Sequence, residues 1–305
     1  GPLSGVIYGV MDLLFGRSQL AWQIVSLVII SVQCFLFNKI LLMSKAFNEN
    51  TYIPGVIYGI LMSWFFDLFT LTPAIMGLTF VLIAIGGVLG HMELKAKKDE
   101  QLLYIGLHLG VAVMFYLPYI IVIPLILLGF AFFTGTVPRR YLLFLYGTFL
   151  PIVLAIMFYM FTGRLREVFM QFVYTLIDYP VTFYFTWIEF LILFSLPLFF
   201  MLAGIFRVIQ GARLTVFQSN LSQFMILWLL IGVAFFFLVR EKAPAYLVIL
   251  IPPFSFFISH YFFSIRKKWL AEIVFLIFLV GPVLFNLGTI FSFFITSEFI
   301  NTDKY

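Results

Sequence analysis

Residues 71–90, LTPAIMGLTFVLIAIGGVLG, contain no charged side chain, and the charged run ELKAKKDEQ follows almost at once at 93–101. A helix of about 20 apolar residues crosses the roughly 30 Å hydrocarbon core of a bilayer, so this segment predicts a membrane span. Across all 305 residues, 64% are hydrophobic and only 10% are charged, whereas soluble domains are about 25% charged. The sequence therefore excludes a soluble globular protein and predicts an integral membrane protein.

Similar apolar segments, separated by charges and prolines, recur along the chain. Together with 71–90 they are 20–43, 54–66, 102–119, 120–136, 141–162, 181–206, 220–239, 244–263 and 269–295. We predict an all-α, polytopic transmembrane helical bundle of about ten spans, within a range of roughly 8 to 11. Segment 54–66 is short, and only Pro118 and Pro124 separate two others, so these segments are candidates for broken or re-entrant helices.

The distribution of basic residues predicts the orientation of the bundle. The loops on one side carry 12 of the 18 basic residues: Lys39, Lys45, Lys95, Lys97, Lys98, Arg139, Arg140, Arg207, Arg213, Arg266, Lys267 and Lys268. Because basic loops stay in the cytoplasm, that side is predicted to be cytoplasmic, in the inner membrane of a bacterium. The net charge of +5 then reflects topology and not nucleic-acid binding.

This topology divides the chain into three regions. Residues 1–19 have apolar side chains at near-helical spacing but are too short to span, so we predict an outward-facing interfacial helix. Residues 20–296 form a single transmembrane domain, and residues 297–305 form an outward-facing tail. The chain starts at Gly1 without a methionine or a signal peptide, which predicts either a tag-removal scar or a further span upstream.

Most motif-based functions find no support in the sequence. It contains no Walker loop, dinucleotide fingerprint, HExxH or GxSxG motif. The single Cys34 lies in an apolar run, which predicts a buried, inert thiol and excludes a disulfide framework within one chain. Gly86-Gly87 and the motif Gly106–Gly110, GLHLG, indicate close packing of helices.

Two ionisable residues fall inside predicted spans. His108 and Glu189 are candidates for function, because ionisable groups in lipid are costly and tend to line sites or pathways. The structural alternative for His108 is a bond to a neighbouring helix, and that for Glu189 is a structural hydrogen bond. A proton or cation transporter would need several such groups along one path.

A cluster of charges on the predicted outward face suggests a lipid-phosphate site. Its basic members are Arg164, Arg166, Arg240 and Lys242, and its acidic candidates are Asp12, Asp67 and Asp178. Arginine forks suit phosphate or pyrophosphate at the lipid interface; the alternative is snorkelling beside neighbouring acids. No cofactor or protein-built metal cluster is predicted, although Asp67, Asp178 and phosphate oxygens offer an alternative site for a divalent cation.

Residues 1–23, the stretch FNKILLMSKAFNENTYIPGVIYGILMSWFFDLFTLTPAIMGLTFVLIA at 37–84 and the KAKKDE loop at 95–100 carry a family resemblance. They are similar to an uncharacterised bacterial multi-span family, most clearly over residues 1–165, and that family resembles the C-type glycosyltransferases. The resemblance implies transfer of a sugar from a polyprenyl phosphate on the outer face of the membrane. An acidic general base would act on the acceptor, and the four basic residues would neutralise the lipid phosphate.

The chain departs from the glycosyltransferase pattern at its start. The first span and the catalytic acidic loop of those enzymes precede the point that matches Gly1, so no catalytic residue is assigned and Asp12 is not promoted to that role. Whether the protein is an enzyme therefore stays open. The alternatives are a non-enzymatic membrane subunit of an envelope complex and a transporter or lipid flippase. The partners expected are membrane lipid, a polyprenyl-phosphate sugar and envelope proteins, without nucleic acid.

Overall fold

A computed structural model describes residues 1–16, 18–64, 70–94, 99–135, 137–164, 166, 169, 182–183, 187–211, 214–238, 241–242, 244–265 and 267–290. Its α-helices are α1 (Pro2–Phe15), α2 (Gln19–Met43), α3 (Ile53–Met62), α4 (Pro73–Leu94), α5 (Asp99–Phe115), α6 (Val122–Phe133), α7 (Pro138–Phe161), α9 (Trp187–Gly211), α10 (Val216–Leu238), α11 (Ile251–Ser264) and α12 (Lys268–Ile290). The predicted all-α fold is confirmed.

Short elements complete the described chain. The 3-10 helices η2 (Leu117–Ile121) and η3 (Pro244–Leu250) precede α6 and α11. The two-residue strands β1 (Thr182–Phe183) and β2 (Glu241–Lys242) pair in parallel, with Phe183 opposite Lys242. These two strands join segments far apart in the sequence without changing the helical class of the fold.

Each predicted apolar segment contains a helix, but the helices differ in length. Five stretches of the described residues are long and apolar enough to cross a membrane: Gln19–Met43, Pro73–Glu93, Pro138–Phe161, Val216–Phe236 and Leu247–Ser264. The other apolar helical stretches are shorter in the part that the structure describes. Length and composition therefore support five spans directly.

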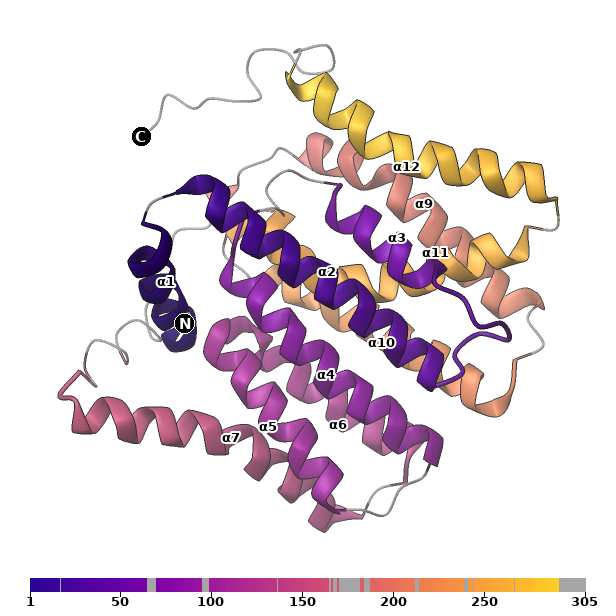
Figure 1. Cartoon of the computed structure of the whole chain (residues 1–305). Coiled ribbons are helices and arrows are strands. Elements are labelled where there is room, and N and C mark those ends of the chain that lie inside the picture. Colours follow the sequence, from indigo (N-terminus) through magenta and orange to yellow (C-terminus); the bar gives the residue numbers. More distant parts are fainter. Residues whose placement is uncertain are drawn as a thin grey trace.

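The helices lie side by side and their links alternate between two ends of the bundle (Figure 1). The links α2–α3, α6–α7, α9–α10 and α11–α12 lie on the right-hand and lower side of Figure 1. We name this side the basic end, because the described residues there include Lys45, Arg139, Arg207 and Lys267. It is the side that the sequence predicts to be cytoplasmic.

Helix α3 covers only part of the distance between the two ends. Its ten residues rise about 15 Å, and beyond Met62 the chain continues without regular helix at 63–64 and 70–72. The Thr70 carbonyl accepts a bond from Ser26 near the start of α2 (3.4 Å), at the end opposite the Asn38–Gly55 contact. In the described part of segment 54–66 the helix ends at Met62, whereas 102–119 and 120–136 contain separate helices joined by η2.

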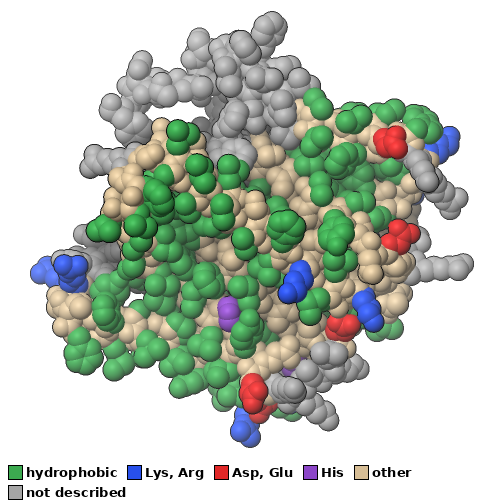
Figure 2. All heavy atoms as spheres, in the orientation of Figure 1, with side chains coloured by type: hydrophobic (Ala, Val, Ile, Leu, Met, Phe, Trp, Pro, Cys, Tyr) green, Lys and Arg blue, Asp and Glu red, His purple; other side chains and the backbone are tan. Residues whose placement is uncertain are grey.

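Helix α4 forms the centre of the bundle. It contacts α2, α5, α6, α10 and η3, and side chains on all its faces are buried. A helix that is apolar all round is stable only inside such a core. In contrast, α2 and α7 expose apolar side chains, and hydrophobic side chains are spread widely over the face seen in Figure 2, with few charged side chains among them. This pattern is the one expected of helices that face lipid.

Buried polar groups connect α2 to α3 and α4. The amide of the fully buried Gln33 donates to the Ile75 carbonyl at 2.7 Å and to the Thr79 hydroxyl at 2.9 Å, and it accepts from the Tyr58 hydroxyl at 3.0 Å. Both N–H donors of the Gln33 side chain and one of the two lone pairs of its oxygen are therefore hydrogen-bonded. Such bonds fix the register of apolar helices, which lack other directional contacts.

Close packing joins α5 and α7, as the GLHLG motif predicted. A Cβ atom on Gly106 would collide with the Phe144 carbonyl, and one on Gly110 would collide with the Thr148 carbonyl. Only glycine permits this approach of two backbones.

Helix α1 packs one face against the bundle end opposite the basic end. Leu3, Ile7 and Tyr8 contact the small apolar cluster around Phe115, and the Tyr8 hydroxyl donates to the Leu71 carbonyl at 2.9 Å. The other face exposes apolar side chains such as Leu13, at 85%. Its position in a membrane interface stays a prediction.

Candidate functional site

A cavity of about 530 Å³ opens at the basic end of the bundle. Four elements surround it: the α2–α3 link, the end of α9, the start of α10 and the end of α11. The lining residues are Ala46, Phe47, Asn48, Glu49, Arg207, Val208, Leu214, Gln218, His260, Phe263 and Ser264. The volume is within the usual range for small-ligand sites, and the lining mixes polar and apolar side chains.

The α2–α3 link enters the cavity wall through a tight turn at the end of α2. The amide of Lys45 donates to the Leu42 carbonyl and that of Ala46 to the Leu41 carbonyl, both at 3.0 Å. This pair of bonds is the Schellman arrangement, which places one residue in the left-handed region. Lys45 occupies that position with φ 47°, and Ala46 is 1% exposed against the core.

Gln218 holds this link against the start of α10. Its side-chain oxygen accepts a hydrogen bond from the backbone N–H of Thr215 at 3.0 Å, and its backbone N–H donates to the Thr215 hydroxyl at 3.2 Å. These reciprocal bonds form a capping box at the first turn of α10. The side-chain nitrogen donates to the Lys45 carbonyl and to the Asn48 side-chain oxygen, each at 3.1 Å.

Close contact between α9 and α11 positions the opposite wall. A Cβ atom on Gly204 would overlap the backbone carbonyl of Phe257, so the two helices touch through their main chains. Arg207 and His260 each follow that contact by three residues, about one helical turn. Both side chains consequently line the same cavity.

Aromatic rings form the apolar part of the wall. The Phe47 ring lies 4.6 Å from the His260 ring and 5.1 Å from the Phe263 ring, measured between centroids. Phe256 packs behind His260 at 4.7 Å. The His260 Nε2 is buried without a hydrogen-bond partner, so its ring contributes here through packing.

Arg207 and Glu49 bring opposite charges to the cavity. Both side chains are exposed, and neither forms an ion pair or hydrogen bond with any residue that the structure describes. The ion pair found at the basic end, between Arg140 and Asp99 at 3.0 Å, lies outside the lining. In the described ranges, no three His, Cys, Asp or Glu side chains are grouped to hold a metal ion. Both charged side chains are therefore available to a ligand in the cavity.

The structure describes only part of the predicted outward site. Arg164 and Arg166 are exposed beyond α7, at the end opposite the cavity, and Asp12 is exposed on α1. Lys242 lies in β2, opposite Phe183. Arg240, Asp67 and Asp178 lie outside the described residues. Convergence of the four basic residues on one phosphate stays a prediction.

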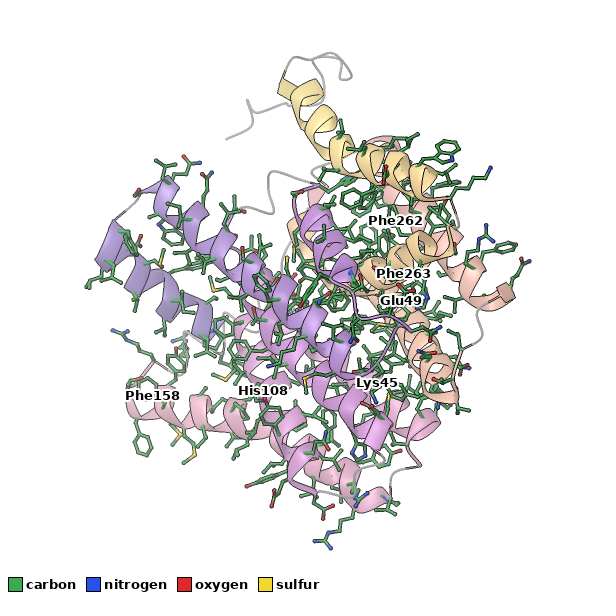
Figure 3. All side chains as sticks on the ribbon, turned by 45° about the vertical axis from the view of Figure 1, so that its right-hand side comes forward. Lys45, Glu49, His108, Phe158, Phe262 and Phe263 are labelled. Carbon is green, nitrogen blue, oxygen red and sulfur yellow. The ribbon has the colours of Figure 1, made fainter. Side chains whose placement is uncertain are left out.

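The two residues predicted to lie inside spans, His108 and Glu189, do not line the cavity where the structure describes them. His108 Nδ1 donates to the Tyr104 carbonyl of its own helix at 2.8 Å, and not to a neighbouring helix. Figure 3 shows His108 far from the cavity residues Glu49 and Phe263. Glu189 falls in the first turn of α9, and its side chain lies outside the described part. Cys34 is half-buried, less enclosed than expected.

The cavity was not predicted from the sequence, although two signals in the sequence point to it. Thr215 and Gln218 have the spacing of a capping box, which marks a helix start. His260 stands alone in an apolar run, FFISHYFFS at 256–264, as much as His108 does in its own segment. Only the fold brings these residues next to Asn48 and Arg207.

Five apolar helices of spanning length indicate a helical membrane protein, and a ligand-sized cavity opens at one end of its bundle. Residues 3–294 match the model of a family of unknown function, DUF6427, and the chain belongs to this family. No curated protein and no solved structure matches it.

Proposed function

We propose that this protein is a multi-pass protein of the bacterial cytoplasmic membrane that binds the phosphate-bearing headgroup of a lipid in the cavity at its basic end. The observation that carries the proposal is Arg207 on the wall of a cavity that also has an aromatic face. The basic end faces the cytoplasm, following the positive-inside rule. The helices α2 to α7 and α9 to α12 supply about ten crossings, one of which contains the short helix α3.

Two sets of donors in the cavity suit a phosphate. The Arg207 guanidinium is a planar fork that binds phosphate oxygens in pairs. The Asn48 side-chain oxygen accepts from Gln218, which leaves its NH₂ group as a further donor at the cavity wall. Gln218 itself is fully engaged in the capping box and the link, so it holds Asn48 in place.

Apolar surface beside the cavity suits the lipid chains. Phe206 and Ile209 on α9 and Val216 on α10 are exposed, and each lies within two positions of a lining residue in the sequence. A lipid whose headgroup occupies the cavity would therefore find apolar helix surface next to it. A soluble phosphate compound would leave this surface unused.

The test measures binding of short-chain phosphatidylglycerol and phosphatidylethanolamine to the purified protein in detergent. One charge-assisted hydrogen bond contributes about 1.5–3 kcal/mol, so Arg207→Gln should weaken binding of both lipids about tenfold or more. Arg139→Gln is the matched control, because Arg139 is exposed at the same end but outside the lining. Equal effects of the two variants would reject the site.

A C-type glycosyltransferase relative, acting on the opposite membrane face, is the second candidate function. The observation that favours it is that Arg164 and Arg166 are both exposed and unpaired among the described residues, just beyond α7. A polyprenyl phosphate would be their ligand. Arg164→Ala should then reduce retention of polyprenyl phosphate while Arg139→Ala leaves it unchanged. Retention unaffected by both variants would remove this candidate.

A further inference from the structure

We propose that the cavity is selective for a zwitterionic headgroup, a phosphate diester that carries a primary amine, as in phosphatidylethanolamine. This inference rests on the proposed function, since it names the ligand class of the same site. The observation behind it is that a carboxylate, Glu49, and a guanidinium, Arg207, line the same cavity. A carboxylate on the wall would repel a ligand that carries only negative charge.

Glu49 is held at the cavity by its neighbours in the α2–α3 link. Asn48, one residue earlier, accepts from the Gln218 amide at 3.1 Å, and Phe47 packs against Phe263. Figure 3 shows Glu49 beside Phe263 near the end of α11, with Lys45 further along the link. These contacts of the link therefore place Glu49 at the cavity wall, where its side chain is exposed.

Arg207 and Glu49 do not neutralise each other. They form no ion pair, and neither is paired to another described residue. Opposite charges attract and like charges repel, most strongly where solvent is partly excluded. A lone phosphate would be attracted by Arg207 and repelled by Glu49, whereas a phosphate joined to an ammonium group would be attracted by both.

The aromatic wall also favours a cation. Phe47, two residues before Glu49 in the link, packs against Phe263 of α11 with ring centroids 5.1 Å apart, and both rings line the cavity. An ammonium group near the face of an aromatic ring is stabilised by the ring quadrupole. The glycerol headgroup of phosphatidylglycerol offers neither charge nor cation–π contact at this position.

The experiment compares the affinities of short-chain phosphatidylethanolamine and phosphatidylglycerol, measured on the intact protein in detergent. The wild-type protein should prefer phosphatidylethanolamine by about tenfold. Glu49→Gln should reduce this preference to within about twofold while keeping binding of phosphatidylglycerol. Glu272→Gln is the matched control, because Glu272 is exposed in the first turns of α12 and outside the lining; it should leave the preference unchanged.

The outcomes separate the two proposals. The zwitterion inference is overturned if the wild-type protein shows no preference between the two lipids, or if Glu49→Gln leaves the preference intact. The lipid-binding function still stands in that case if Arg207→Gln weakens the binding of both lipids. Loss of any Arg207 effect overturns both. O-phosphoethanolamine in solution is the final probe. If it binds as tightly as the short-chain lipid, the ligand is a soluble zwitterion, and the lipid assignment is wrong while the charge pairing stands.

Discussion

The side-chain amide of Gln218 donates a hydrogen bond of 3.1 Å to the backbone carbonyl of Lys45, 173 residues earlier in the chain. The bond joins the first turn of α10 to the turn after α2. Because the same amide also holds Asn48, one side chain fixes both the helix start and the cavity wall. The geometry of the candidate site thus depends on a contact between distant parts of the sequence.

Gln218→Ala should lower the thermal stability of the purified protein. The change removes the side-chain half of the capping box and leaves the Lys45 carbonyl and the Asn48 side-chain oxygen without their donor, at a cost of about 1–3 kcal/mol. A thermal unfolding curve in detergent should show a midpoint lower by several degrees. Gln223→Ala on the exposed face of the same helix is the control and should change little. Similar shifts for both variants would contradict the role of Gln218.

Replacing Lys45 with glycine should stabilise the protein. Lys45 has φ 47°, and a side chain in this left-handed region costs about 1 kcal/mol relative to glycine. Lys39→Gly, in the regular part of α2, should instead destabilise by about 1 kcal/mol. The two changes remove the same charge and side chain at one end of the same helix. Unfolding midpoints that move in the same direction would show that the turn is not strained.

Gly204→Ala should separate α9 from α11. The added methyl group meets the Phe257 carbonyl, and such overpacking costs about 1–3 kcal/mol. Since the contact positions Arg207 and His260, lipid binding should fall together with the unfolding midpoint. Gly9→Ala, where the added atom meets nothing on α1, should be neutral or slightly stabilising. A tolerated Gly204→Ala with unchanged lipid affinity would indicate that the helices have room to move apart.

The orientation of the bundle can be measured by labelling single cysteines in a Cys34→Ser background. Arg139→Cys at the basic end should react with a membrane-impermeant maleimide only when the cytoplasmic face is accessible. Arg164→Cys at the opposite end should react in intact cells with a permeable outer envelope. Both positions are exposed in the structure, so the reagent reaches them. Labelling of both from one side would contradict the predicted alternation.

The apolar segments located the helices because lipid imposes one requirement on every span. Backbone groups must be satisfied within the segment, so each long apolar run becomes a helix, as α2, α4 and α7 show. The helix in the short segment 54–66 ends at Met62, and whether it is broken or re-entrant stays a prediction. Close packing at Gly106 was predicted for the same local reason, since small residues mark helix contacts.

The residues of the cavity could not be predicted from local sequence in this way. The same reasoning that selected His108 would have selected His260, yet the first bonds to its own helix and the second lines a cavity. Sequence shows that both are polar groups in apolar runs, but the neighbours decide what each does. The outward basic residues were selected by topology alone, and the cavity lies at the other end.

The amino-acid sequence by itself determined that this protein is helical, membrane-embedded and basic at one end, because hydrophobicity and charge act on each segment independently of its neighbours. Only the tertiary structure decided that Glu49, Arg207, Gln218 and His260 share one cavity. Their proximity arises from the contacts of α9 with α11 and of α10 with the α2–α3 link. These contacts join residues more than 50 positions apart, and no periodicity within a single helix encodes them.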